Sequence, residues 1–282
     1  MNKTIKTLVA LLPLFITSCY NDDTTVTTNP QQDRVVTINA GITREGSSTT
    51  GSPFANNDKI LITNVTRKNA GLICNSAVFT YDGSSWTSEG TLLWSAGEEN
   101  TFQAVYPSTA SYSSFIVPSD QSTEENFKSA DWMTCEKTVT LNNLTTASSL
   151  NLEFKRKMAM VVVQITGEID VTTLSSLVVE SPSPNNNITF ETQDHKITAY
   201  KDANTGNMFS AIIAPGSKSS EALLCTLKLS DSTEKSLTLQ NNIDFQAGKK
   251  YTFQCSLTSQ SNSASTRSAS PDNLTLVSVE PM

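Results

Sequence analysis

Few residues of this 282-residue chain have the types and spacing that catalysis requires. The single histidine, His195, leaves little for histidine acid–base chemistry, a histidine zinc site or a serine–histidine–aspartate triad. The carboxylate pairs Glu98–Glu99 and Glu124–Glu125 are chain neighbours in polar loops, which favours a solvated surface over the opposed carboxylates of glycoside hydrolysis. We therefore predict that the protein is not an enzyme and requires no cofactor and no metal ion.

Two other patterns could bind ligands. The spacing Asp202-x-Asn204-x-Gly206 is that of the opening of a calcium loop, but the later glutamate is missing, and turn chemistry explains these residue types at a hairpin tip. The tryptophans Trp86, Trp94 and Trp132 could form a platform for sugar rings or could pack in a core. We favour the turn for the first pattern and core packing for the second, with glycan binding as the alternative.

The segment Ile16-Thr17-Ser18-Cys19 is the clearest chemical signal. Two lysines precede an apolar run over residues 8–16, which is the layout of a secretory signal and is too short for a membrane span. The segment resembles the lipobox of a bacterial lipoprotein. That resemblance implies cleavage between Ser18 and Cys19, lipidation of the Cys19 thiol by diacylglycerol with fatty acids such as palmitate, and, from Asp22-Asp23, display on the outer membrane. The alternative is an ordinary signal peptide that ends near a cysteine.

Composition places the mature chain outside the cell. It holds 37% hydrophobic and 17% charged residues, with serine, threonine and asparagine supplying most of the polarity, and this mixture is typical of extracellular β structure. The formal net charge is -7 and no basic block is present, so nucleic acid is excluded as a partner.

The first structured element is expected over residues 34–43. Its apolar residues alternate with polar ones, which predicts a half-buried strand, and the inward set is Val36, Ile38, Ala40 and Ile42. Arg44 then opens a polar loop over residues 45–53. An arginine between an edge strand and a loop is accessible to a trypsin-like protease.

Short strands at regular spacing are expected over most of the remaining chain, as in a β sandwich. The Asp82-Gly83 turn predicts a hairpin, residues 195–200 are expected to pair with 208–214, and the apolar run over 150–165 is interpreted as one continuous strand because of its β-branched residues. Sustained helical periodicity is absent. The expected strands cover residues 59–65, 76–81, 86–94, 101–106, 115–118, 132–140, 150–165, 175–180, 188–190, 195–200, 208–214, 223–229, 235–239 and 251–257.

The end of the chain combines a polar linker with a strand. Residues 258–270 are almost wholly serine, threonine, asparagine and glutamine, which is typical of a flexible linker. The apolar residues beyond it have strand character and need an acceptor edge, and they are Leu274, Leu276, Val277 and Val279. Parity also places Cys225 and Cys255 inside one core, either as buried thiols, which we favour, or as a disulfide.

An ordered set of short motifs covers nearly all of the mature chain and resembles fimbrillin-type pilins of the Mfa-like or FimA-like kind. Lys155 and Trp132 depart from the family pattern. The motifs are Phe54 with Asp58-Lys59-Ile60, Tyr81 with Trp86 and Leu93-Trp94, Phe102-Gln103-Ala104-Val105-Tyr106-Pro107, Asp120-Gln121, Ser129-Ala130-Asp131-Trp132, Leu152-Glu153-Phe154 with Met158, residues 211–215, and Phe245-x-Ala247-Gly248-Lys249-x-Tyr251.

The resemblance implies an all-β fold of two tandem transthyretin-like, Greek-key sandwiches. It also implies assembly with other fimbrial subunits by strand exchange: a protease cuts after Arg44, or less favourably after Arg34, the first strand leaves, and a strand such as Leu274 to Val279 replaces it. The expected segments are a signal peptide (1–18), a tether (19–33), an N-terminal sandwich (34–160), a C-terminal sandwich (161–257) and a linker with a terminal strand (258–282).

Two functional hypotheses follow. The first is a structural or adhesive fimbrial subunit, exported to the cell surface as a lipoprotein with its lipid on Cys19 in the outer membrane, whose partners are other subunits and a host or bacterial surface ligand. The second is a surface lipoprotein that binds glycans through exposed tryptophans and stays monomeric.

Overall fold

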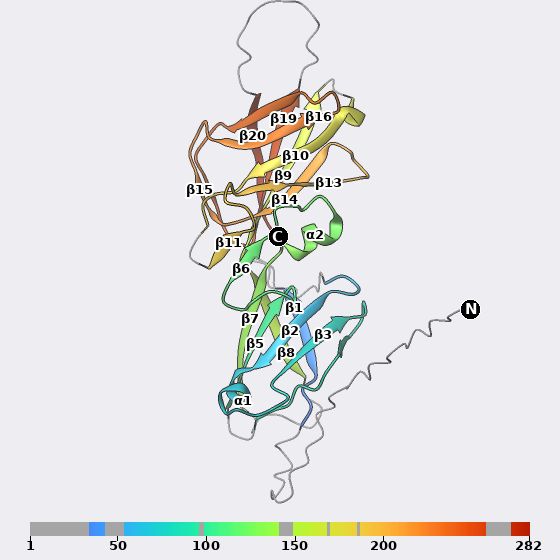
Figure 1. Ribbon diagram of the computed structural model, residues 1–282, viewed down its shortest axis with the longest axis vertical. Helices are drawn as coiled ribbons and strands as arrows, with labels where there is room; N and C mark the ends of the chain where they lie inside the picture. Colours follow the sequence, from blue (N-terminus) through green and yellow to red (C-terminus); the bar gives the residue numbers. More distant parts are fainter. Residues whose placement is uncertain are drawn as a thin grey trace, which may run out of the picture.

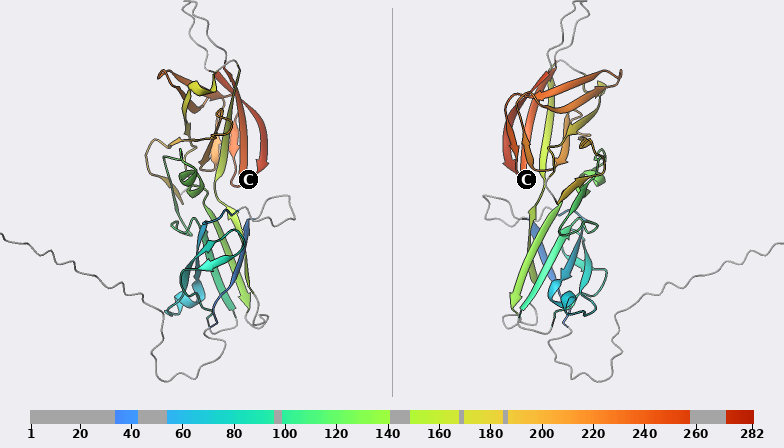
Figure 2. Two further views of the ribbon diagram at one scale, coloured as in Figure 1. Left: turned by 90° about the vertical axis from the view of Figure 1, so that its right-hand side faces the viewer. Right: turned by 60° about the vertical axis from the view of Figure 1, so that its left-hand side comes forward.

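The computed structural model describes residues 34–42, 54–95, 99–140, 149–167, 170–184, 187–257 and 272–282. Strands dominate these residues, and they form two β bodies stacked end to end along the long axis of the molecule (Figures 1 and 2). Two separate hydrophobic clusters form the cores of these bodies. The expected all-β architecture is thus confirmed.

The N-terminal body is a seven-stranded sheet that wraps around the smaller core. The order of its strands is β1-β8-β7-β5-β2-β3-β4, so β1 and β4 are its two edges. The strand bounds are β1 Ile38–Ile42, β2 Lys59–Asn64, β3 Ser76–Tyr81, β4 Trp86–Ser88, β5 Glu99–Tyr106, β7 Met133–Thr140 and β8 Leu150–Arg156.

The C-terminal body contains a nine-stranded sheet of order β12-β10-β16-β17-β20-β19-β9-β14-β13. Two small two-stranded sheets, β6 with β11 and β15 with β18, complete the strands. The bounds are β6 Phe115–Val117, β9 Ala159–Gly167, β10 Leu174–Glu180, β11 Ile188–Phe190, β12 Lys196–Thr198, β13 Tyr200–Lys201, β14 Met208–Ile213, β15 Gly216–Lys218, β16 Leu223–Leu229, β17 Glu234–Leu239, β18 Ile243–Phe245, β19 Lys249–Leu257 and β20 Asp272–Pro281.

Helices are short in the described part of the chain. Besides the 3-10 turn η2 (Val171–Thr173), they are α1 (Val65–Asn69) and α2 (Glu124–Ser129). Each has a polar N-cap, because the side chains of Asn64 and Thr123 accept backbone N–H groups three residues ahead. No helix among the described residues is long and apolar enough to cross a membrane.

Three expected strands differ from the structure. The run over residues 150–165 is two strands, because β8 pairs within the N-terminal sheet and β9 pairs with β19 and β14 in the C-terminal one. The strand expected over 86–94 ends at Ser88. The pairing of 195–200 with 208–214 is wrong except at Tyr200–Lys201: β12 instead pairs with β10, and His195 lies in the left-handed region with φ 54°.

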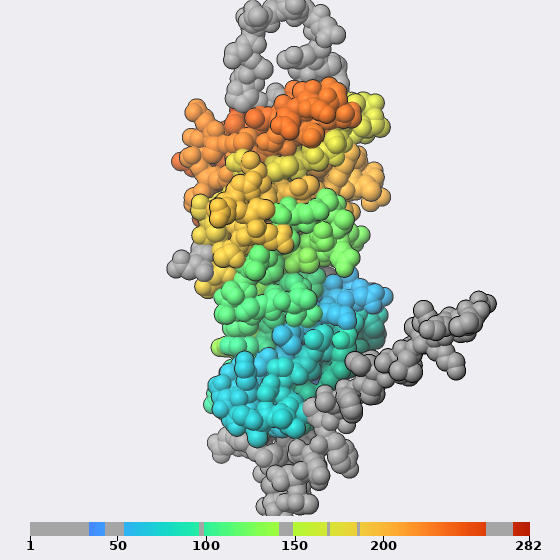
Figure 3. All heavy atoms as spheres, viewed as in Figure 1, coloured from blue at the N-terminus to red at the C-terminus, as the bar shows by residue number. Residues whose placement is uncertain are grey.

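A segment of the N-terminal half completes the C-terminal core. Residues 107–132 leave the first sheet after β5, and β6 pairs in parallel with β11 of the second half. The side chains of Phe115, Val117, Ala130 and Trp132 all belong to the larger core. Figure 3 shows the green part of the chain at the surface of the middle of the molecule, next to the yellow C-terminal half. A cut of the chain at residue 160 would therefore leave part of the larger core on the N-terminal side.

A buried ion pair ties the two bodies together. At the end of β8, Arg156 Nε donates to Asp131 Oδ2 at 2.8 Å, and Arg156 Nη1 donates to the Met282 carbonyl at 3.0 Å. Both charged side chains are largely shielded from water. Burial raises the pKa of Asp131, and the neighbouring guanidinium of Arg156 opposes that rise. One arginine thus joins the start of β7, the crossing between the bodies and the end of β20.

We predict that Arg156→Met lowers the free energy of unfolding by about 3–5 kcal/mol at pH 7, because it leaves a buried carboxylate without its cation. The folded-state pKa of Asp131 then rises further above the unfolded value of 3.8. An acid with a raised folded pKa loses stability as the pH rises through that pKa. The deficit relative to wild type should therefore shrink as the pH falls toward 4, as measured by urea unfolding across this range.

The control is the double variant Asp131→Asn/Arg156→Met, which has no carboxylate to titrate at this site. Its difference from wild type should be flatter with pH than that of the single variant. A single-variant deficit that stays constant from pH 7 to pH 4 would contradict the role given to Asp131.

Candidate functional site

Strand β1 covers the smaller core from the edge of its sheet. Val36, Ile38 and Ile42 are buried and belong to that core, and Ala40 is half-buried against it. The neighbouring strand β8 contributes Leu150, Leu152 and Phe154 to the same cluster. An edge strand thus carries a share of the core that would otherwise face water.

Within the described residues, the ladder of β1 runs along one side only. It pairs in parallel with β8, from Ile38 opposite Leu150 to Ile42 opposite Phe154. Just before the strand, Val36 N–H donates to the Leu92 carbonyl at 2.8 Å and Trp94 N–H donates to the Arg34 carbonyl at 3.0 Å. These contacts hold the start of the segment, while the strand proper depends on β8.

A groove separates β1 from the opposite edge strand, β4. We call it the β1–β4 groove; its volume is about 370 Å³ and none of its lining residues carries a charge. The lining residues are Val35, Val36, Thr37, Ile38, Asn39, Ala40, Phe79, Tyr81, Ser84, Ser85, Trp86 and Ser88. The sheet therefore curls until its edges face each other without pairing.

The structure separates the three tryptophans. Trp94 is 2% exposed in the smaller core and Trp132 is 4% exposed in the larger one. Trp86 is half-buried in the β1–β4 groove, with its ring centroid 5.0 Å from that of Phe54 and 5.1 Å from that of Tyr81. The three rings therefore share no platform, and of the three only Trp86 lines the β1–β4 groove.

The other expected site residues are distributed as follows. Ser18, Cys19 and Arg44 lie outside the described residues. Arg34 lies at the start of the segment, partly buried. Asp202 Oδ1 accepts the Asn204 N–H at 2.7 Å, as turn chemistry predicts, and no group of three or more histidine, cysteine, aspartate or glutamate residues suited to a metal ion occurs in the described part of the chain.

The expected terminal strand, β20, lies inside the C-terminal sheet of its own chain. It pairs in parallel with β17 over Asp272 to Leu274 and antiparallel with β19 out to Pro281. Leu274 is buried and Leu276 is half-buried, whereas Val277 is 58% and Val279 48% exposed. Beyond Leu274 its ladder therefore has only β19 as a described neighbour.

Cys225 and Cys255 both lie buried in the larger core. They are thiols, and the described residues contain no disulfide. Burial raises the pKa of Cys225, and the neighbouring Cys255 adds to the rise. Both cysteines therefore behave as small apolar side chains.

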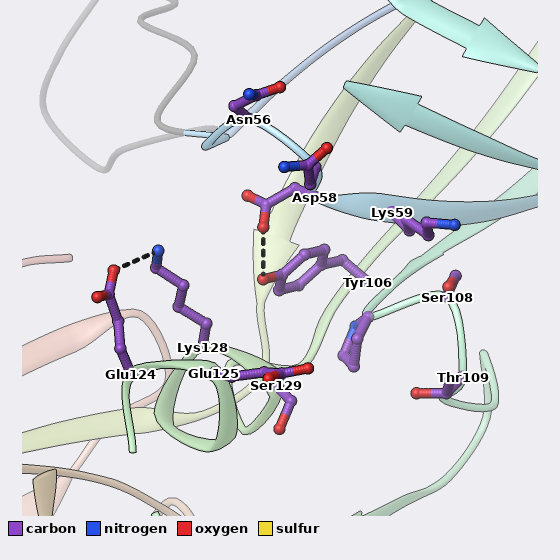
Figure 4. Close-up of a pocket in the computed structure, with 12 residues that line it drawn as sticks. Asn56, Asp58, Lys59, Tyr106, Ser108, Thr109, Glu124, Glu125, Lys128 and Ser129 are labelled. Atoms are coloured by element: carbon purple, nitrogen blue, oxygen red, sulfur yellow. Dashed lines mark hydrogen bonds and ion pairs between the residues drawn. The ribbon is translucent and has the colours of Figure 1, made fainter. Parts of the chain in front are cut away.

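A second recess, which sequence reasoning missed, lies between the start of β2 and α2 (Figure 4). Asp58 accepts the Tyr106 hydroxyl at 3.2 Å and the Ala55 N–H at 2.7 Å, and burial raises the pKa of Asp58. Glu124 and Lys128 form an ion pair on the far wall. The recess joins elements that are distant in sequence, so no local pattern marks it.

We predict that Ile38→Ala loosens β1 selectively. The change removes buried methyl groups and should cost about 2–5 kcal/mol, and because β1 has one described ladder, the loss should appear first as local opening. Hydrogen exchange at the amides of residues 38–42 should accelerate at least about tenfold, while β9 and β19 stay protected. Equal acceleration in all three strands would contradict local opening, and Val35→Ala, at a 59% exposed position, is the matched control.

Comparison with known proteins identifies the fold. A family model described as fimbrillin-like matches residues 43–271, which begin directly after β1 and end directly before β20. A solved protein from Bacteroides ovatus assigned to cell adhesion has a TM-score of 0.62 at 13% identity, covering 88% of this chain and 98% of that one. A second, from Bacteroides uniformis with the same assignment, has a TM-score of 0.53 at 16% identity, covering 88% and 99%.

The tip fimbrial protein Mfa3 of Porphyromonas gingivalis, solved with a C-terminal truncation, is also similar, at 8% identity over 79% of this chain and 93% of that one. Its TM-score is 0.40. Comparison with curated proteins finds no match. Likeness at such low identity shows the fold alone, whereas the family model spans most of the sequence. The chain therefore belongs to the fimbrillin-like family.

Proposed function

We propose that this chain is a structural and adhesive subunit of a surface fimbrium, exported as an outer-membrane lipoprotein through Cys19 and assembled by strand exchange after proteolysis. The family membership supports the fimbrial role. The observation that carries the assembly step is the position of β1, an edge strand with buried apolar residues and a single described ladder partner.

Losing β1 would create two matched deficits. The edge of β8 would expose backbone donors and acceptors along Leu150 to Phe154, and the smaller core would lose the cover of Val36, Ile38 and Ile42. An unpaired backbone edge and an exposed apolar stripe are repaired together only by another strand with alternating apolar residues. A strand from a second subunit meets both needs.

The two candidate arginines have different consequences. A cut after Arg44 detaches everything before it, including the lipid-bearing residue and β1. A cut after Arg34 leaves β1 joined to the body through residues 43–53, so the strand stays tethered beside its own groove. Arg44 is therefore the site that the proposal requires.

The proposed donor is β20, whose apolar residues begin at Leu274. In the intact chain it occupies a place between β17 and β19, so donation requires that it leave its own sheet. Residues 258–271, which connect it to β19, can span about 50 Å when fully extended. This reach supports a strand that crosses to a neighbouring subunit.

We predict that a trypsin-like protease trims the precursor to a chain beginning at Glu45 and that oligomer ladders follow. Arg44→Ala should abolish both the trimming and the ladders, because β1 then stays attached, and Arg34→Ala should leave both intact. N-terminal sequencing and non-reducing gels of unheated samples measure the two steps.

If trimming at Arg44 yields a permanent monomer, the strand-exchange mechanism is contradicted. That result would favour the rival hypothesis of a surface lipoprotein that never polymerises. Ladders formed equally well by Arg44→Ala would show that assembly does not depend on the release of β1.

A further inference from the structure

The β1–β4 groove combines three aromatic side chains with neutral polar ones. Its walls hold the aromatic rings of Phe79, Tyr81 and Trp86 together with serine, threonine and asparagine side chains, and no charged residue. The recess of Figure 4, by contrast, is lined by Asp58, Lys59, Glu124, Glu125 and Lys128. A neutral, hydroxyl-rich groove with an aromatic wall suits a neutral polyhydroxylated ligand, since an ionic ligand would find no charge partner there.

Backbone groups on both walls face the groove without partners. The Thr37 carbonyl accepts the Leu150 N–H at 2.8 Å and so faces β8, and because successive residues of a strand point their N–H and C=O groups to opposite sides, those of Ile38 and Ala40 face the groove. Just after β4, the Glu89 N–H donates to the Val78 carbonyl and so faces β3. By the same alternation, the backbone N–H and C=O groups of Trp86 and Ser88 face away from β3, toward the groove. Within the described residues, none of these four has a backbone partner on that side.

Where β1 and β4 come closest, the groove is too narrow for an added strand. Cα atoms of β1 and β4 approach within 8 Å of each other, whereas a strand hydrogen-bonded to both edges needs about 9.5 Å between them, twice the usual spacing. The volume of about 370 Å³ lies within the range of small-molecule sites, about 300–1,000 Å³. The dimensions therefore favour a compact ligand over a peptide.

The polar groups that remain match sugar hydroxyls. The Trp86 Nε1–H has no hydrogen-bond partner among the described residues. Ser84 and Ser85 donate their hydroxyl hydrogens to Asp82 at 2.9 and 2.8 Å, so their oxygens are left to accept hydrogen bonds. A flat ring beside donors and acceptors is the arrangement that holds the apolar face of a sugar and its hydroxyl groups at once.

We propose that the β1–β4 groove binds a neutral saccharide, with one sugar ring against Trp86 and its hydroxyls bonded to Ser84, Ser85 and the open backbone of Ile38 and Ala40. A neutral saccharide would be the ligand through which the subunit adheres, so this inference rests on the proposed function. Because β1 forms one wall, its release would dismantle the site, and a donor strand in its place would rebuild it between two subunits.

The experiment uses the intact precursor and five neutral probes: lactose, maltotriose, cellotriose, xylotriose and mannotriose. Saturation-transfer NMR detects binding, and a change in tryptophan fluorescence on binding reports on Trp86, because Trp94 and Trp132 are buried and do not line the groove. We expect at least one probe to bind with a Kd of about 10 mM or tighter. Trp86→Ala and Ser88→Lys should each weaken binding at least about tenfold, while Thr87→Lys, on the same strand but outside the lining residues, leaves it unchanged.

Thermal melting confirms that each variant is folded. If Trp86→Ala disturbs the packing against Phe54, Ser88→Lys provides the test of the groove. The proposal is overturned if none of the five saccharides binds, if both variants bind as well as wild type, or if a peptide of residues 272–281 occupies the groove instead. Assembly is measured separately by protease trimming, so failure of sugar binding leaves strand exchange standing.

Discussion

The N-terminal body depends on one parallel ladder, between β1 and β8. That ladder is the attachment of an edge strand whose apolar side chains cover the smaller core. Edge strands are weak points that proteins shield or exploit, and here the edge carries buried residues instead of charged ones. The same strand closes the core and forms one wall of the β1–β4 groove. Both roles proposed for the N-terminal body, strand exchange and saccharide binding, therefore depend on β1.

In the C-terminal body, the proposed donor strand β20 is not at an edge. Strand β20 is an interior member of a nine-stranded sheet, and its end is held by Arg156, which also pairs with Asp131. The crossing between the bodies is therefore joined to the strand proposed as donor. Release of β20 would remove the Met282 contact of Arg156 and leave the Asp131 pair as the remaining tie at this junction.

The sequence allowed the local elements to be predicted because burial in these sheets follows a period of two. Alternation placed Val36, Ile38 and Ile42 inside, and parity placed Cys225 and Cys255 in one core. Pairing between distant segments could not be predicted, since nothing local says that β12 joins β10 or that residues 150–165 divide between two sheets. The groove was missed for the same reason: β1 and β4 meet only after the sheet curls, and three similar tryptophans acquire different environments.

The most direct test of the central claim is the N-terminal residue of subunits isolated from assembled fimbriae, determined by intact-mass analysis and sequencing. If assembly follows removal of β1, the chains begin at Glu45 and lack both the lipid and the first strand. Fimbriae whose subunits begin at lipid-bearing Cys19 and retain β1 in its own sheet would contradict the account.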